Sequence, residues 1–135
     1  MLSSETNMMI WELSRWGADT GDALQRVVGD IELYHSLLLE FAVSDECDRL
    51  KIALEEADFL EAFALAHDLK GVSATLGLTP LYDILKDMVE VLRALKSDPR
   101  EPKDLAQELR SLKAEFQRLQ VKREEFRKIF EKEIR

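Results

Sequence analysis

The stretch FLEAFALAHDLKGVSATLGLTP, residues 59–80, predicts one helix, its end and the start of the next helix. Gly77 follows the periodic part of the stretch, and glycine is the residue that most often ends a helix. Thr79 and Pro80 then suit the N-cap and the first position of a new helix. We therefore expect a helix at about 59–76, a tight turn and a second helix packed against the first.

The rest of the chain also divides into helical segments, and no stretch alternates for long enough to predict a β-strand. Asp19 and Asp30 are suitable N-caps that follow breaks at Gly17 and Gly29, and Asp58 is a suitable N-cap for the helix at 59–76. The acidic run 44–48 is either a solvated turn of a longer helix or a true break, and the sequence leaves both open. The expected helical segments are 5–16, 20–28, 31–42, 49–57, 59–76, 81–96 and 103–135, with a proline-containing linker at 97–102.

Composition narrows the class of protein. A chain of 135 residues predicts a single domain over 1–135, and its net charge of -8 argues against nucleic acid as the main partner. The single cysteine, Cys47, excludes an intramolecular disulfide and a metal site built from several cysteines. No apolar run approaches the roughly 20 residues of a membrane span, and the first residues do not resemble a signal peptide. We therefore expect a cytoplasmic protein without a membrane partner.

The last segment repeats apolar residues at steps of four and three, the spacing of a helix packed on other helices. At about 1.5 Å per residue, 30 residues would span roughly 45 Å, which is longer than the neighbouring helices. We therefore expect a core at about 15–119 and a helical extension at 120–135. This extension is either a solvated helix end or a dimerisation or docking surface formed by Phe126, Ile129 and Phe130.

Projection of residues 59–76 onto a helix separates a core face from an outer face that carries a histidine. The expected core stripe consists of Ala62, Leu65, Leu69, Val72 and Leu76. His67 lies opposite the middle of that stripe. The residues around it are small or apolar, with one lysine at the flank: Phe63, Ala64, Lys70, Gly71 and Ala74. Because a solvated face would carry mainly Glu, Lys and Gln, this outer face predicts a docking surface.

The spacing of His67, Lys70 and Gly71 suits phosphoryl chemistry. A neutral imidazole is a competent nucleophile, and an ammonium group one helical turn away would stabilise an added phosphate. Glycine at the i+4 position would leave room for the phosphate and for a partner's backbone. A histidine without a functional role is the alternative, and His35 is interpreted in that way. Asp68 does not form a usable i,i+4 ligand pair with His67, so we expect no metal site.

The segment AHDLKGVSATLGL, residues 66–78, resembles the signature of the histidine-containing phosphotransfer (HPt) family, Ala-His-x-Leu-Lys-Gly followed by a small residue and Leu-Gly. Residues 15–41 are similar to the N-terminal helices of that family, and 78–93 to the helix after the phosphorylated one. The resemblance covers about 15–96. It implies an all-α fold, an antiparallel four-helix bundle with short N-terminal helices and a long C-terminal helix.

The resemblance also implies residue roles: His67 as the phosphoacceptor, Lys70 as its electrostatic support and Gly71 as the residue that clears space. Many family members place Gln or Glu 22 residues after the histidine, where it can orient the imidazole, and that position is Val89 here. The residues expected to contact a partner on the two helices are Phe63, Ala64, Ala74, Lys86, Val89 and Arg93.

The function implied is that of a phosphorelay intermediate in two-component signalling. It would accept a phosphoryl group from a receiver-domain aspartate or a kinase and pass it to another receiver-domain aspartate. The implied partners are response-regulator receiver domains and hybrid histidine kinases, and magnesium would belong to the receiver rather than to this chain. No Gly-rich nucleotide loop is present, so we do not expect a kinase.

Two other functions stay open at this point. The chain could be a phosphorylation-independent adaptor that binds receiver domains, which the unusual Val89 would suit. It could also be an oligomeric scaffold built on its C-terminal helix. A monomer and a dimer formed through that helix are both compatible with the sequence.

Overall fold

A computed structural model of the protein describes residues 4–97 and 102–134. Within these ranges the chain forms seven α-helices and no strand, which confirms the all-α class. The helices are α1 (Ser4–Trp16), α2 (Thr20–Arg26), α3 (Ile31–Ala42), α4 (Glu46–Glu55), α5 (Phe59–Thr75), α6 (Thr79–Ser97) and α7 (Pro102–Ile129). Most of the linker expected at 97–102 lies outside the described residues.

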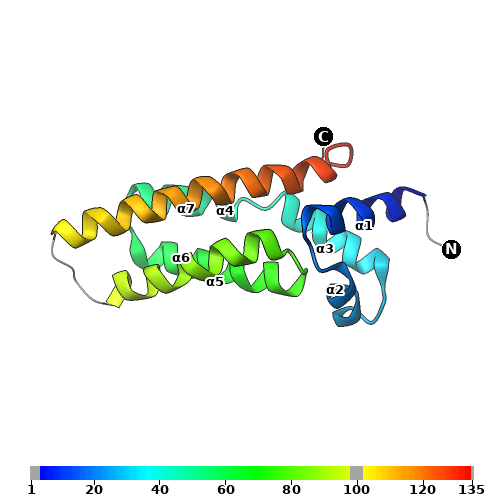
Figure 1. Cartoon of the computed structure of the whole chain (residues 1–135), viewed down its shortest axis with the longest axis horizontal. Helices are drawn as coiled ribbons and strands as arrows, with labels where there is room; N and C mark the ends of the chain where they lie inside the picture. Colours follow the sequence, from blue (N-terminus) through cyan, green and yellow to red (C-terminus); the bar gives the residue numbers. More distant parts are fainter. Residues whose placement is uncertain (1–3, 98–101, 135) are drawn as a thin grey trace.

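The helices form an elongated molecule with two differently built ends (Figure 1). At one end α5 packs on α4 and on α6, and α7 packs on α6 and on α4, so these four helices close into a ring. At the other end lie α1, α2 and α3, and α7 continues along the molecule until it packs on α1. No described helix is both long and apolar enough to cross a lipid bilayer.

Side-chain caps fix three helix starts where the sequence predicts them. Asp19, Asp30 and Asp58 each accept a hydrogen bond from a backbone N–H three residues later, at 3.0–3.1 Å. The acidic run 44–48 is a true break: α3 ends before it, and the hydroxyl of Ser44 accepts a hydrogen bond from the first backbone N–H of α4. The predicted second helix of the pair, α6, begins at Thr79, slightly earlier than its expected first position.

The end of α5 is held by the N-terminal helices. Gly77 has a φ of 71°, and a Cβ at this position would overlap the carbonyl oxygen of Asp19. The backbone N–H of Asp19 donates to the carbonyl of Gly77 at 2.8 Å. Arg26 donates to two carbonyl oxygens of the last turn of α5, and the hydroxyl of Tyr34 donates to the carbonyl oxygen of Leu76 at 2.8 Å. These bonds satisfy carbonyl groups that a helix end leaves without partners.

The segment 120–135 is helical as far as Ile129, as predicted, but it does not extend beyond the core. The side chains of Phe126 and Phe130 are 0% and 1% exposed, and they belong to the same core as the other helices. The ring of Phe126 lies 5.7 Å from the rings of both Trp16 and Phe41, measured between centroids. The two phenylalanines therefore cannot form an exposed dimerisation surface. The prediction compared the length of the last helix with that of its neighbouring helices only. It failed because α1 and α3 continue the surface on which α7 packs.

One residue of the core stripe expected on α5 is not buried, and two residues outside the stripe are buried. Val72 is 36% exposed, whereas Ala66 and Ser73 are fully buried. Because α5 packs on α4 at one side and on α6 at the other, its buried face is centred closer to Ala66 than the stripe assumed. The opposite face remains open, and it carries the histidine.

Candidate functional site

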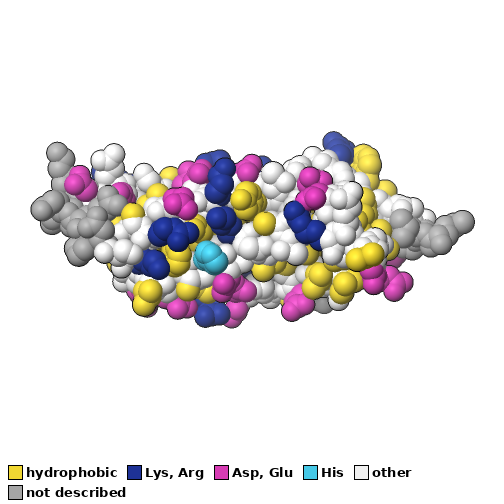
Figure 2. Space-filling view, turned by 90° about the horizontal axis from the view of Figure 1, so that it is seen from below, with side chains coloured by type: hydrophobic (Ala, Val, Ile, Leu, Met, Phe, Trp, Pro, Cys, Tyr) yellow, Lys and Arg dark blue, Asp and Glu magenta, His cyan; other side chains and the backbone are white. Residues whose placement is uncertain are grey.

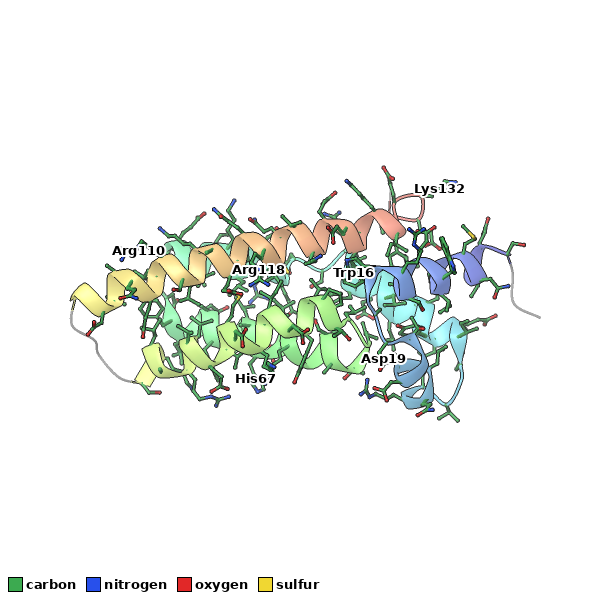
Figure 3. All side chains as sticks on the ribbon, viewed as in Figure 1. Trp16, Asp19, His67, Arg110, Arg118 and Lys132 are labelled. Carbon is green, nitrogen blue, oxygen red and sulfur yellow. The ribbon has the colours of Figure 1, made fainter. Side chains whose placement is uncertain are left out.

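His67 lies near the middle of α5 with its side chain exposed. Figure 3 shows this side chain pointing away from the helices, on the side opposite α7. Figure 2, seen from that side, shows a histidine at the surface with Lys and Arg side chains close to it. Among the described residues, none forms a hydrogen bond or an ion pair with the imidazole. Both ring nitrogens are therefore open to solvent or to a partner.

Gly71 lies one turn after His67 on the same exposed face. A Cβ built at this glycine would meet nothing within 4 Å, so packing inside the chain does not require glycine here. Lys70 is half-buried at the flank of the face, and Ala64 is exposed. The positions of Ala64 and Gly71 therefore present only small side chains beside the imidazole.

Phe63 contacts both the histidine and side chains of α6. Its ring centroid lies 5.8 Å from that of His67, with the two planes tilted by 37°. Two cations of α6 lie over the same phenyl ring: Lys96 Nζ at 4.0 Å and Arg93 Cζ at 5.1 Å from the centroid. The sequence analysis missed Lys96. Lys96 follows Arg93 by three residues and so lies on the same face of α6. The helical spacing after Lys86 and Arg93 could therefore have predicted it.

Val89 is buried and does not lie on the exposed surface where a partner contact was predicted. Its side chain is 0% exposed because α6 packs on both α5 and α7. Lys86 and Arg93, which were predicted for the same partner surface, are exposed. Since Val89 is apolar and buried, α6 offers no hydrogen bond to the imidazole from this position.

A groove with a volume of about 680 Å³ borders the other flank of His67, between α5 and the end of α3. Phe41 and the partly exposed Val72 contribute to its apolar lining. The acidic side chains that line it are Glu40, Glu46 and Asp68. Burial raises the pKa of the Glu46 carboxyl, and the negative charge of Asp68 raises it further. The histidine therefore separates a basic flank on α6 from an acidic flank on the groove.

Comparison with known families identifies this arrangement. A family model described as the Hpt domain matches residues 38–122, which is more than half of the chain. The chain belongs to the Hpt domain family. No curated protein and no solved structure gave a match. The matched range of this Hpt domain contains the whole of α5 and α6, and with them the histidine, the lysines and the glycine described above.

Membership in the Hpt family places the chain in phosphorelay signalling as a phosphotransfer module rather than a kinase domain. Hpt domains interact with receiver domains and kinases in such relays. In the described part of this Hpt domain, no group of three or more His, Cys, Asp or Glu is placed to hold a metal ion. The site consists of one exposed imidazole, the glycine surface beside it and the cations of the neighbouring helix.

Proposed function

We propose that this Hpt domain is a phosphorelay intermediate and that His67 is its phosphoacceptor. The observation that carries this proposal is the exposed imidazole, which has no hydrogen-bond or ion-pair partner among the described residues. The second histidine of the chain, His35, does not meet this condition. Its Nε2 lies 2.7 Å from a carboxylate oxygen of Glu133, and its side chain is 29% exposed.

The transfer needs only the outer nitrogen of the imidazole. The lone pair of Nε2 attacks the phosphorus of a receiver's aspartyl phosphate in line with the bond that breaks. The aspartate carboxylate leaves with the electron pair of the broken P–O bond. The proton on Nδ1 stays on the ring, so the phosphorylated ring is cationic until it loses that proton to water. Attack on the same phosphorus by a second receiver's aspartate reverses these bond changes.

Lys70 and Gly71 serve this reaction in different ways. The ammonium group of Lys70 lies one helical turn from His67 and stabilises the negative charge that arrives with the phosphoryl group. Gly71 leaves the space into which the phosphate and the receiver's backbone enter, which agrees with the absence of any atom within 4 Å of a Cβ built there. Magnesium belongs to the receiver domain.

The receiver or hybrid kinase would contact the surface around the histidine. Its contact residues on this chain are Ala64, Ala74, Lys86 and Arg93, together with part of Phe63. The small side chains allow close approach, and the cations of α6 suit a receiver with acidic side chains beside its phosphoaspartate. Val89 has no part in this contact.

A phosphotransfer assay tests the proposal with a matched pair of variants. A phosphorylated receiver is mixed with the wild-type chain, with His67→Gln or with His35→Gln, and the acid-labile label on each chain is measured. We expect label on the wild type and on His35→Gln and none on His67→Gln. Label on His67→Gln would refute the assignment. Receivers that bind the wild-type chain without ever labelling it would favour the adaptor function.

A further inference from the structure

The imidazole of His67 needs a defined orientation, because in-line attack requires Nε2 to point at the incoming phosphorus. A hydrogen bond to the other ring nitrogen is the usual way to fix a histidine. Here no described residue provides one, and the position on α6 from which a side chain could reach the ring holds the buried Val89. Some other contact has to restrict the ring if the site is preorganised.

Phe63 supplies a contact of that kind. It precedes His67 by four residues on α5, so the two side chains lie on one face of the helix, and their ring centroids are 5.8 Å apart. Aromatic pairs at such separations prefer offset or tilted arrangements and contribute about 0.5–1.5 kcal/mol beyond their buried area. A tilt of 37° is compatible with this preference.

The phenyl ring is itself held from the neighbouring helix. Lys96 Nζ and Arg93 Cζ lie 4.0 and 5.1 Å from its centroid, both within the range of a cation–π interaction. Arg93 is also 3.7 Å from a carboxylate oxygen of Glu90, one turn earlier on α6. The orientation of Phe63 therefore depends on two helices, α5 through its backbone and α6 through the two cations.

We propose that Phe63 is a positioning residue for the phosphoacceptor and that Lys96 and Arg93 hold its ring against the imidazole of His67. This inference rests on the proposed function. The aromatic contact takes the place of the missing hydrogen bond: it limits rotation of the imidazole without occupying either ring nitrogen. It also keeps Lys96 within roughly 10 Å of the imidazole, a distance at which salt of 0.1 M leaves part of its attraction for a phosphoryl group.

Two simpler roles for Phe63 make different predictions. As a contact for the receiver only, it would change the affinity of the two proteins and leave the rate within their complex unchanged. As packing only, it would change stability and leave both the rate and the affinity of the folded chain unchanged. A positioning role changes the rate within the complex and leaves the affinity nearly as it was.

The kinetic experiment uses Phe63→Leu, which removes the ring but keeps apolar bulk, and Phe63→Tyr, which keeps the ring. Leu60→Ala is the control, because Leu60 is 70% exposed on the same helix and lies outside the site. We expect Phe63→Leu to lower the maximal rate of transfer from a phosphorylated receiver about tenfold, with the half-saturating receiver concentration within about twofold of wild type. Phe63→Tyr restores at least half of the rate, and Leu60→Ala keeps the wild-type rate.

A second measurement does not depend on phosphotransfer. In the unphosphorylated chain, side-chain couplings measured by NMR report whether His67 occupies one rotamer. We expect one dominant rotamer in the wild type and in Phe63→Tyr, averaging in Phe63→Leu, and partial averaging in Lys96→Met.

The outcomes separate the two proposals. Equal maximal rates for wild type and Phe63→Leu, or an averaged rotamer already in the wild type, would overturn the positioning role. A change confined to the half-saturating concentration would also overturn the positioning role and leave Phe63 with its contact to the receiver alone. If the wild-type chain accepts no phosphoryl group from receivers that bind it, the proposed function fails, and the NMR measurement still decides whether Phe63 orients the ring.

Discussion

Both histidines of this chain lie beside a phenylalanine, yet the two pairs have opposite properties. His35 stacks on Phe130, with centroids 6.2 Å apart and planes 23° from parallel, and its Nε2 is paired with Glu133 at 2.7 Å. His67 lies against Phe63 at a similar separation of 5.8 Å, but no described residue binds its nitrogens. An aromatic neighbour alone therefore does not distinguish a histidine with bound nitrogens from one with free nitrogens.

The difference lies in where each phenylalanine comes from. Phe63 is on the same helix as its histidine, and it is only partly buried, while the imidazole beside it is exposed. Phe130 comes from the other end of the sequence, and it is 1% exposed in the core formed with the N-terminal helices. The first pair is open to a partner protein, while the second pair fastens the end of the chain.

The largest expected effect is the loss of stability when each of the two phenylalanines is replaced by alanine. Phe130→Ala should lower the free energy of unfolding by about 3–5 kcal/mol, because it removes a fully buried ring and leaves a cavity. Phe63→Ala should lower it by about 1 kcal/mol, since Phe63 is only partly buried. Urea denaturation followed by circular dichroism measures both. Similar losses for the two variants would show that Phe63, beside His67, is as much a part of the core as Phe130, beside His35.

The next largest effect is a pH-dependent loss of stability, and it arises from the buried Tyr34 on α3. Burial, and the negative charge of Asp19 to a smaller extent, raise the pKa of the Tyr34 hydroxyl from 10.0 to about 12. Because the folded state keeps this proton more tightly, the stability it contributes is complete below pH 10 and is lost as the pH rises from 10 to 12. This loss amounts to about 2–3 kcal/mol.

Tyr34→Phe provides the matched variant for this measurement. It should cost about 1 kcal/mol at pH 7, through the lost hydrogen bond to the carbonyl of Leu76, and it should remove the additional loss above pH 10. Urea denaturation of both proteins between pH 7 and 12 gives the difference. Parallel pH profiles for the two proteins would contradict the assignment to Tyr34.

A smaller effect is expected at Gly71, on the open face. Gly71→Ala should raise the free energy of unfolding by up to about 1 kcal/mol, because alanine favours a helix and the new methyl group meets no atom within 4 Å. Gly77→Ala is the control and should destabilise, since its φ is 71° and the methyl group would overlap Asp19.

The same position tests whether the glycine clears space for phosphotransfer. Gly71→Leu should remain at least as stable as the wild type and should transfer phosphate about tenfold more slowly, because the larger side chain fills the surface beside His67. A Gly71→Leu chain that accepts phosphate at the wild-type rate would show that the open surface there has another cause.

The smallest expected effect removes the carboxylate that contacts His35. Glu133→Gln should cost less than about 1 kcal/mol, because the two side chains are 29% and 41% exposed and water weakens their interaction. The double variant His67→Gln/Glu133→Gln should still accept no phosphoryl group, since His35 remains against Phe130 without a lysine one turn away. Label on His35 in this variant would show that a free nitrogen is sufficient.

Local sequence signals predicted much of the fold and part of the site. Asp19, Asp30 and Asp58 marked helix starts because a capping oxygen and the N–H that it binds are only three residues apart. The position of His67 on the outer face followed from the helical period in the same way, and its role as phosphoacceptor stays a prediction. The motif around it identified the family, which the match to residues 38–122 confirms.

The errors came from residues whose surroundings are built by distant segments. Val89 is buried because α6 has a neighbour on each side, and Phe126 is buried because α1 and α3 extend the surface under α7. Lys96 reaches Phe63 only because α5 and α6 pack side by side. The period of one helix gives the direction of each side chain but not the number of helices that cover it.

The sequence by itself therefore determined where several helices begin, which family the chain belongs to and which face of α5 carries the histidine. These properties depend on interactions within a few residues, which the order of the amino acids specifies directly. Only the tertiary structure decided that the aromatic end of α7 closes the core, and that Arg93 and Lys96 of α6 lie over the ring of Phe63. Those contacts join different helices, and packing between helices sets them.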